Sequence, residues 1–578
     1  MRINRVIIKN YRNLRDVDIE LENIVTLIGE NNGGKSNFLK AISIPLSSDD
    51  GSSSKKLSWY DINKDAKNEY IQFIMNNTQS IIDGSLTEDA FSPKIPIVDI
   101  ILYFLPDDNE HYNVKDILID IDKWIGAIHY RFYIKNTLKL LSQLKEIIVN
   151  NNDLSKIQMS LLPIDLYESS LTVPITINGN NGIKIPYDTL SQFCSVYLPA
   201  ERDNFASNAG KLGSKILSDM FNNALSVQSH ANIENAYNNF FDVIKKESDL
   251  DNIINWQNYS DIGNAKEFFH KISVLPSMPR MSNILDNVRL GYENDFMHLQ
   301  GLGYRNLILL AVLLNSYIKT QRDCYFRLVT IEEPEAHLCV SNILLSGSLI
   351  KSISQKNKYT QIVFSTHNEE LVNKLGLSKV IIIHNGKVMS LNTQLKNSEL
   401  DYLLTNPNTD IFKILYSRRV ILVEGITEEL LIKSYLQTKS ELSDIKVFAF
   451  HKGYKNIIKI WKKINQNSTS KLGIVRDFDN QPNAQKEHES LQANNVLIKT
   501  TQGYTLETDI TELNYELLVQ NYGDEYKWTN LNKDQLQKDW REKKSDVMIK
   551  ISHDLLKGKL NDFKLPNHIQ DIISFMME

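Results

Sequence analysis

Two stretches of this 578-residue chain hold side chains whose types and spacing could do chemistry. The first, from Gly29 to Ser36, matches the phosphate-loop pattern G-x-x-x-x-G-K-[ST] at every fixed position. In such a loop the backbone N–H groups surround the phosphates, Lys35 reaches the β- and γ-phosphates, and the Ser36 hydroxyl holds Mg²⁺. The alternative is an ordinary Gly-rich turn, but the bare pattern arises by chance in only roughly 2% of chains of this length. The pattern therefore predicts a nucleotide site.

Three later stretches look like the remaining parts of one nucleotide site. Gly301 and Gly303 stand in a Gly-rich turn directly before an apolar helical pattern, where phosphate can bind. Glu332 and Glu333 follow a buried strand, so one could hold Mg²⁺ through water while its neighbour orients an attacking water. His367 follows the next apolar strand and could sense the γ-phosphate. The alternatives are a solvated helix start for the two acids and a structural role for the histidine.

The second chemical centre is a set of carboxylates in the last third of the chain. Glu424 ends an apolar strand, and Glu428, four residues on, can converge with it on one cation. Asp477 and Asp479 end a later strand, and in an extended segment they project to the same side, which predicts a divalent-metal shelf. Glu507 follows a third apolar element. From these residues alone, a cluster of solvated loop carboxylates is an equal alternative.

The elements that must position these groups are apolar strands and amphipathic helices, a pattern that predicts an α/β fold. A short strand over residues 24–28 precedes the phosphate loop, and a helix opens at residue 37. The other elements expected before residue 207 are a hairpin (2–21), a polar surface loop (47–56), strands (97–104, 175–185 and 196–203) and a long helical segment (114–150).

The sequence pattern changes again after residue 206. Residues 207–287 are mostly helical and hold no recognisable nucleotide-site residue, so we expect an insertion that contacts another subunit. The alternative is that this insertion only covers one edge of the sheet. Residues 392–410 are polar and contain Asn-Pro-Asn, which predicts a linker, and a new α/β pattern starts after it.

Composition sets limits on partners and location. The net charge of −5 gives no overall basic footprint for nucleic acid, so local patches must be sought. One candidate is the lysine-rich segment 452–463, which could face a phosphate backbone, although a solvated amphipathic helix is slightly favoured. The three cysteines lack C-x-x-C spacing, which argues against a zinc ribbon or a disulfide framework and fits a cytoplasmic protein. The longest apolar run, residues 307–314, is too short to span a bilayer.

The nucleotide motifs resemble the ABC-type ATPase head of recombination and repair ATPases. Residues 29–36 match Walker A, residues 300–306 the signature region, residues 331–333 Walker B, and His367 the switch histidine. The resemblance implies that two heads sandwich ATP, and hence a homodimer or a higher oligomer. Glu332 stands where many heads have Asp, and Gln300 stands near the usual Ser, so hydrolysis of ATP is less secure than its binding. The nucleotide-binding residues implied are Gly29, Asn32, Gly34, Lys35, Ser36, Gly301, Gly303, Glu332, Glu333 and His367.

The carboxylate pattern is similar to that of a Toprim domain, and the order head, linker, Toprim resembles the OLD (overcoming lysogenization defect) family of ATP-dependent nucleases. The resemblance implies a DNA endonuclease, regulated by nucleotide and active in anti-phage defence, with a helicase or another defence protein as a possible partner. Two Mg²⁺ or Mn²⁺ ions are implied at Glu424, Glu428, Asp477, Asp479 and Glu507. The family's late catalytic lysine matches Lys557, with Lys559 as the alternative. A DNA-binding repair-type ATPase or clamp with a non-catalytic Toprim domain is the rival interpretation.

The predicted fold is therefore an α/β ABC-type ATPase head with a mostly helical insertion, followed by a Toprim α/β domain. The expected boundaries are residues 1–206 and 288–391 for the head, 207–287 for the insertion, 392–413 for the linker and 414–578 for the Toprim domain.

Overall fold

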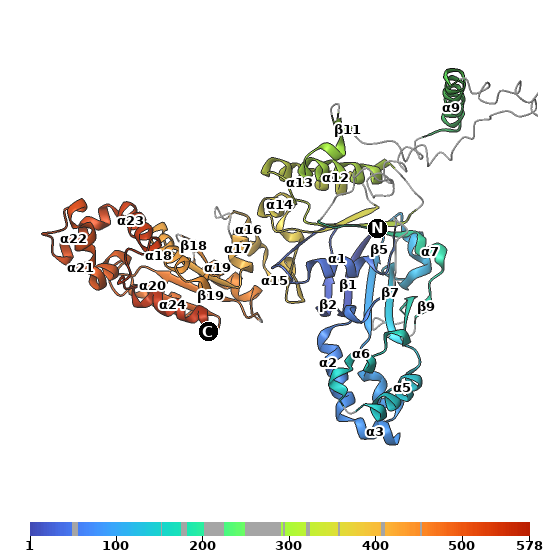
Figure 1. Cartoon of the computed structure of the whole chain (residues 1–578), viewed down its shortest axis with the longest axis horizontal. Coiled ribbons are helices and arrows are strands. Elements are labelled where there is room, and N and C mark those ends of the chain that lie inside the picture. The colour runs from blue at the N-terminus through green and yellow to red at the C-terminus, as the bar shows by residue number, and fades with distance from the viewer. Residues whose placement is uncertain are drawn as a thin grey trace, which may run out of the picture. The chain divides into compact units, whose positions relative to one another are not determined.

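The computed structural model describes residues 1–48, 56–151, 153–174, 182–200, 225–248, 291–292, 295–319, 324–356, 359–405, 411–450, 454–466 and 468–578 (Figure 1). The chain groups into two compact units. The first comprises residues 1–12, 21–25 and 38–366, and the second comprises residues 13–20, 26–37 and 367–578. No helix in the described part of the chain is long and apolar enough to cross a membrane.

One sheet of the N-terminal region is antiparallel. Its strand order is β2-β1-β5-β7-β8-β9, and β6 pairs with β7. The strands are β1 (Arg2–Tyr11), β2 (Leu14–Glu20), β5 (Val98–Leu105), β6 (Leu118–Asp120), β7 (Ile125–Ile134), β8 (Tyr167–Val173) and β9 (Ile183–Lys184). The helices that follow its strands include α2 (Lys64–Asn76), α3 (Thr78–Asp83) and α5 (Thr137–Asn150). The predicted hairpin and the predicted strand at 97–104 are confirmed.

The long helix expected over residues 114–150 is wrong in its first part. Only α5 is an α-helix there, whereas β7 pairs with both β5 and β8. Ile121, in the part that is not an α-helix, is 69% exposed. The run IGAIHYRFYI is rich in β-branched and aromatic residues, and pairing on both sides favours a strand over a helix.

The second sheet carries the phosphate loop. Its order is β16-β15-β3-β14-β13-β10-β4, and β10, β13 and β14 are parallel neighbours. The strands are β3 (Ile24–Ile28), β4 (Ser47–Ser48), β10 (Phe193–Leu198), β13 (Phe326–Glu332), β14 (Thr360–Ser365), β15 (Val380–His384) and β16 (Lys387–Ser390). Every residue of β3 and β14 is buried, as expected for parallel strands covered on both faces. The helices are α1 (Lys35–Ser43), α12 (Leu302–Lys319), α13 (Val340–Lys356) and α14 (Glu369–Leu375).

Several sequence predictions fall wholly or partly outside the described residues. Most of the insertion at 207–287 does so, and within its described portion α9 (Val227–Glu247) is helical. The predicted loop at 47–56 is described only at its ends. Of the strand expected at 175–185, β9 is described. A subunit contact through the insertion therefore stays a prediction.

The segment predicted to be a linker is helical where it is described. It holds part of α15 (Leu391–Gln394), then α16 (Asn397–Thr405) and the start of α17 (Ile411–Tyr416). Leu400 and Leu403 are buried in one apolar core with Val420 and Trp461 of the C-terminal domain. The polar composition of this segment predicted a linker wrongly, because its polar residues occupy the exposed side of short helices whose leucines are buried.

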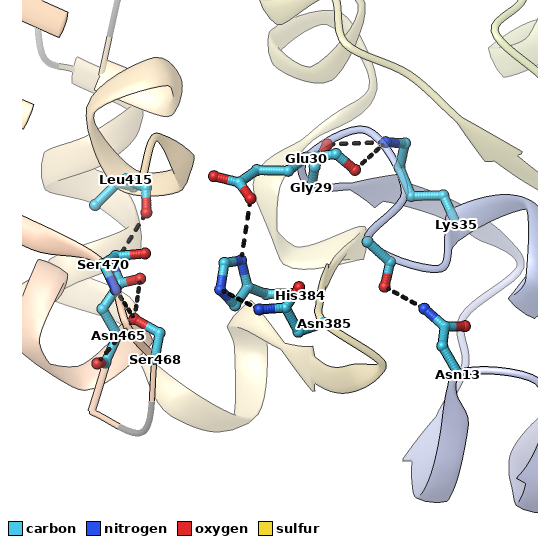
Figure 2. A network of polar contacts seen from close by, with 11 residues as sticks. Asn13, Gly29, Glu30, Lys35, His384, Asn385, Leu415, Asn465, Ser468 and Ser470 are labelled. Atoms are coloured by element: carbon cyan, nitrogen blue, oxygen red, sulfur yellow. Dashed lines mark hydrogen bonds and ion pairs between the residues drawn. The ribbon is translucent and has the colours of Figure 1, made fainter. Parts of the chain in front are cut away.

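Polar contacts also tie these helices to the C-terminal domain. The buried Asn465 side chain donates to the carbonyl oxygens of Leu415 (3.1 Å) and Trp461 (3.3 Å), as Figure 2 shows in part. Lys463 pairs with Glu399 at 2.6 Å. The segment is thus packed against the last domain rather than extended between domains.

The C-terminal domain is built on a four-stranded parallel sheet of order β18-β17-β19-β20 (orange in Figure 1). The strands are β17 (Arg419–Val423), β18 (Lys446–Ala449), β19 (Lys471–Arg476) and β20 (Val496–Thr500). The helices are α18 (Ile426–Gln437), α19 (Tyr454–Ile464), α20 (Pro482–Glu489), α21 (Leu506–Tyr526), α22 (Lys533–Glu542), α23 (Lys544–Leu556) and α24 (Asn567–Met577). One apolar core includes α19, and the other includes α18, α21, α23 and α24.

The lysine-rich helix α19 follows the amphipathic alternative. Ile457, Ile460, Trp461 and Ile464 are buried in the core. Three of its four lysines meet protein acceptors: Lys455 pairs with Glu487, Lys462 donates to the carbonyl oxygen of Leu491 at 3.3 Å, and Lys463 pairs with Glu399. Lys452 lies outside the described residues. This helix therefore presents no continuous row of unpaired lysines for DNA in the described part.

Candidate functional site

The lysine of the phosphate loop is hydrogen-bonded to the backbone of the loop itself. Lys35, the first residue of α1, is 7% exposed, and its Nζ donates to the carbonyl oxygens of Gly29 and Glu30, both at 2.9 Å (Figure 2). The ammonium group is thereby held at the helix N-terminus, where the helix dipole adds positive potential. Ser36 and Asn32 are exposed, so both can meet a ligand.

The glycines of the loop are required by close backbone packing. Gly29 has φ +149°, and a Cβ there would lie 2.0 Å from the carbonyl oxygen of Ile383. Gly34 has φ +121°, and its Cβ would lie 2.8 Å from Nδ2 of Asn13. The Asn13 amide and the backbone N–H of Gly386 both donate to the Gly33 carbonyl oxygen, at 3.0 and 2.9 Å. The loop conformation therefore depends on the turns at Asn13 and Gly386.

His384 is a loop neighbour that sequence reasoning missed. Its Nδ1 lies 3.9 Å from Oε2 of Glu30, and Figure 2 shows the two side chains directed toward each other. The pair is ionic only when the histidine is protonated. No motif marks His384, because it meets the loop through the pairing of β15 with β3.

The predicted Walker B acids lie at the carboxyl end of β13. Glu332 ends the strand beside Ser365 of β14, and the backbone N–H of Glu333 donates to the Ser365 carbonyl oxygen at 2.9 Å. Burial and then the charge of Glu332 raise the pKa of the Tyr197 hydroxyl, which hydrogen-bonds Glu332. His367 is exposed, two residues beyond the end of β14. The three predicted residues thus share one edge of neighbouring strands.

The predicted signature turn packs on the segment after Walker B. Gly301 directly precedes α12, and a Cβ at Gly303 would lie 2.5 Å from the carbonyl oxygen of His337. The buried Asn306 donates to the Ala336 carbonyl oxygen at 3.1 Å. The glycine at 303 therefore lets α12 pack closely against this segment.

Four of the predicted acids come together in the C-terminal domain. Glu424 and Asp477 follow the adjacent parallel strands β17 and β19, and the Asp477 backbone N–H donates to Glu424 Oε2 at 3.2 Å. Glu428 lies in the first turn of α18, where its Oε2 accepts from the Gly425 backbone N–H at 2.9 Å. Glu507, in the first turn of α21, is fully buried.

The four carboxylates affect one another electrostatically. Burial and then the charges of Glu428, Glu507 and Glu424 raise the pKa of Asp477 from 3.8 to about 8. Burial and then Glu507 likewise raise the pKa of Glu428. Crowded carboxylates with this little solvent repel one another, so the group favours a proton or a cation.

Asp479 is not placed as predicted. The chain leaves the extended conformation after Asp477, and Asp479 lies in a turn with φ +47°, its N–H donating to the Tyr504 carbonyl oxygen at 3.1 Å. The alternation that would direct Asp477 and Asp479 to one side therefore does not apply. Asp479 is also absent from the charges that act most on Asp477.

The predicted lysine is also misplaced. Lys557 is exposed at the C-terminal end of α23, and Lys559 pairs with Asp554 at 3.5 Å. The lysine that meets the acids is Lys544, at the opposite end of α23, whose Nζ lies 3.3 Å from Glu507 Oε2. A helix of this length separates its ends by roughly 20 Å. Burial lowers the pKa of Lys544, but the charges of Glu507, Asp477 and Glu428 outweigh it and raise the pKa.

Comparison with known families now adds to this geometry. The family model described as "AAA ATPase domain" matches residues 1–372, which is more than half of the chain. The chain belongs to the AAA ATPase domain family. A second model, described as "Overcoming lysogenization defect protein-like, TOPRIM domain", matches residues 415–479 of this ATPase. The predicted resemblance to the OLD family is confirmed at the level of these two domains.

Two curated relatives of this AAA-family ATPase carry the name Endonuclease GajA. The relative from Bacillus cereus strain HuB5-5 is 26% identical over 268 residues, or 40% of this chain and 38% of that protein. The relative from strain VD045 is 24% identical over 157 residues, or 27% of this chain and 26% of that protein. The chain thus spans well under half the length of either relative.

Two of the solved structures that match are titled as SMC heads. An SMC head bound to the C-winged helix domain of ScpA covers 68% of this chain and 100% of its own, with 14% identity and a TM-score of 0.34. The SMC head domain from Thermotoga maritima covers 68% of this chain and 99% of its own, with 14% identity and a TM-score of 0.28. Scores this low carry no argument about the site.

The donor set of the Toprim domain fits a hard divalent cation in its chemistry. All four carboxylates offer oxygen ligands, and in the described part neither oxygen of Glu507 nor Oγ1 of Thr505 has a hydrogen-bond partner. As the side chains stand, no group of three His, Cys, Asp or Glu residues in that part is arranged to hold a metal ion. Backbone N–H groups occupy one oxygen each of Glu428 and Asp477, and Lys544 pairs with Glu507.

Sequence reasoning missed three residues beside the acids of the Toprim domain: Lys544, Tyr454 and Arg476. Lys544 starts a helix in a charged segment and has no motif around it. Arg476 directly precedes Asp477 at the end of β19, and this position could have marked it as a neighbour of the acids. Tyr454 begins α19, and only folding brings it to the same edge of the sheet.

Proposed function

We propose that this protein is a divalent-metal-dependent DNA endonuclease whose cleavage is regulated by nucleotide at the ATPase head. The observation that carries the proposal is the convergence of Glu424, Glu428, Asp477 and Glu507 from two strands and two helices, with the pKa of Asp477 raised to about 8. A structural ion-pair network would not gather three buried acids and the half-buried Glu424 against so little positive charge.

The residues have distinct roles in this proposal. Glu424, Glu428, Asp477 and Glu507 hold Mg²⁺ or Mn²⁺, which when bound supplies an activated water and neutralises the leaving oxygen. Asp477 must release its proton before it can act as a ligand. Lys544 donates to the cleaved phosphate, taking the role that the sequence had suggested for Lys557. Asp479 stays a candidate ligand from the family pattern alone.

The head supplies the proposed regulation. Lys35 and Ser36 bind the phosphates and Mg²⁺ of ATP, and Glu332, Glu333 and His367 act on the γ-phosphate side. Ile28, the last residue of the strand before the phosphate loop, belongs to the same apolar core as Leu422 of β17, the strand that ends at Glu424. Packing of this kind can pass a change at the loop to the Toprim edge without a flexible linker.

The wider setting is part of the proposal and rests on family analogy. We propose that the ATPase heads pair as a homodimer or higher oligomer, with the 207–287 insertion at a subunit contact. The protein would act in the cytoplasm in anti-phage defence, with a helicase or another defence protein as a possible partner. DNA is the expected substrate because the relatives are named endonucleases.

A nicking assay on supercoiled plasmid tests the proposal. Wild type is expected to cut with Mg²⁺ or Mn²⁺ and to stop when EDTA is added, while Asp477→Ala is inactive with either ion. The surface variant Asp534→Ala, at the exposed start of α22, serves as the control and should cut like wild type. Cleavage that persists in Asp477→Ala would refute the site, and DNA binding without any cleavage by wild type would favour a non-catalytic ATPase or clamp.

A further inference from the structure

Arg476 is a buried cation with an unsatisfied donor in the part of the chain that the structure describes. The last residue of β19, it is 7% exposed, and a guanidinium group stays charged in a protein. Its Nη1 has no hydrogen-bond partner, and within the described part of the chain no carboxylate lies within ion-pair distance of it. A charge removed from water in this way is costly unless an anion meets it.

Tyr454 lies in the same neighbourhood and is also unsatisfied. It is 3% exposed, and its hydroxyl has no hydrogen-bond partner in the described part. Burial and then the charges of Glu424 and Glu428 raise its pKa, with Arg476 acting in the opposite direction. The hydroxyl therefore stays a proton donor at neutral pH, and it lies close enough to these residues to feel their charges.

The two residues occupy the face of the sheet opposite Glu428 and Glu507. Val420 and Leu422 of β17 and Ile474 of β19 belong to the core that contains Tyr454, whereas their alternating neighbours belong to the other core. Because side chains alternate along a strand, Glu424 and Arg476 continue the first face, and Asp477 continues the second. Arg476 and Tyr454 thus lie on the same face of the sheet as Glu424, next to the cluster of acids.

Tyr454 is also the first residue of α19, an 11-residue helix. The first backbone N–H groups of a helix have no partner within it, and its positive dipole end attracts anions. Donors of three kinds therefore lie in one neighbourhood: the guanidinium, the hydroxyl and the helix N-terminus. Phosphate accepts hydrogen bonds from all three.

We propose that Arg476, Tyr454 and the N-terminus of α19 form a phosphate subsite that holds the strand phosphate next to the one cleaved at the acids. The inference rests on the proposed nuclease function and deepens it. Arg476 is a positioning residue here: it binds the flanking phosphate and leaves the reacting phosphate to Lys544. A nucleic-acid strand supplies both phosphates, a few ångströms apart along its backbone.

The test measures binding without chemistry. In an Asp477→Asn background with EDTA, duplex DNA binding is followed by fluorescence anisotropy at several salt concentrations. Adding Arg476→Gln should weaken binding about 10-fold and reduce the slope of log Kd against log salt by about one. Tyr454→Phe should weaken binding about threefold and leave the slope unchanged. Lys459→Gln, which removes an exposed charge from the same helix, is the matched control and should change affinity less than twofold.

Other results would overturn the subsite, its assignment to a strand phosphate, or the nuclease proposal. Equal affinity and slope with and without Arg476→Gln would overturn the subsite; if that variant does not fold, unchanged binding by Tyr454→Phe would do so. A third outcome combines two measurements: inorganic phosphate raises the melting temperature only when Arg476 is present, yet Arg476→Gln leaves DNA affinity unchanged. That outcome would overturn the assignment to a strand phosphate. Wild-type cleavage with Mg²⁺ is measured separately: if it is absent while Arg476-dependent binding persists, the nuclease proposal fails and the subsite stands.

Discussion

The backbone N–H of Asp477 donates a hydrogen bond to Oε2 of Glu424 at 3.2 Å, across 53 residues of sequence. The contact exists because β17 and β19 are adjacent and parallel, so their carboxyl ends meet at one edge. It fixes the position of the two acids relative to each other, and α18 and α21 contribute Glu428 and Glu507 to the same cluster. The stability and chemistry of the Toprim domain therefore depend on charge at this edge.

Asp477 should make the metal-free protein less stable as pH rises. Burial and the neighbouring carboxylates raise its pKa from the ordinary 3.8 to about 8, so the folded protein keeps a proton that the unfolded chain loses. The free energy of unfolding therefore falls between about pH 4 and pH 8. Asp477→Asn removes this dependence and should stabilise the protein in EDTA at pH 8 by a few kcal/mol, on the order expected from such a shift.

Urea unfolding at pH 4.5 and pH 8 checks this prediction. The gain from Asp477→Asn should be much smaller at pH 4.5, because that pH lies only slightly above the ordinary pKa of 3.8 and the unfolded chain gains little by ionising the carboxyl. Equal effects of the substitution at the two pH values would contradict the raised pKa.

Lys544 and Lys557 should differ sharply in a matched pair of variants. Lys544→Met leaves the fully buried Glu507 without its cation and should destabilise the metal-free protein by about 1–2 kcal/mol, a figure reduced because the Lys544 side chain is 39% exposed. Cleavage should fall about 100-fold or more, as for the loss of a charged donor to the reacting phosphate.

The exposed Lys557→Met should change neither quantity beyond about 0.5 kcal/mol or twofold in rate. Chemical denaturation and plasmid nicking measure both effects. If Lys557→Met were the inactive variant, the position of Lys544 beside the acids would have no catalytic meaning.

Lys35→Ala should separate nucleotide binding from DNA cleavage. Removing the ammonium group that lies against the Gly29 and Glu30 carbonyls should weaken ATP binding roughly 10- to 100-fold, the size of a charge-assisted hydrogen bond. Fluorescent nucleotide titration measures the affinity, with the exposed Lys64→Ala as the control. Cleavage is then compared across ATP concentrations, and superimposable curves for wild type and Lys35→Ala would rule out regulation by the head.

Gly29→Ala should be far more damaging than Gly301→Ala. The added methyl group at position 29 meets the Ile383 carbonyl oxygen at 2.0 Å and sits at φ +149°, so the backbone must shift at a cost of about 3 kcal/mol or more. At Gly301 nothing lies within 4 Å, and the change should stay within about 1 kcal/mol. Thermal unfolding of the two variants compares them directly, and similar melting temperatures would show that the loop does not need its close packing on β15.

The sequence alone determined the two chemical centres and the class of fold. The phosphate-loop pattern located Lys35 and Ser36, and apolar runs ending in acids located Glu332, Glu424 and Asp477, because buried parallel strands are continuous in apolar residues and end at a common edge. These are local signals, carried by residues close together in the chain.

The tertiary structure alone decided which residues complete each centre. Lys544, Arg476, Tyr454 and His384 reach their sites through helix packing and strand pairing between distant segments, and no local pattern records such contacts. The turn at Asp479 and the helices at 391–416 were also decided by packing, since a tight turn or a short helix is set by its partners more than by its own residues. Local patterns indicated the two candidate centres, and long-range packing decided which side chains surround them.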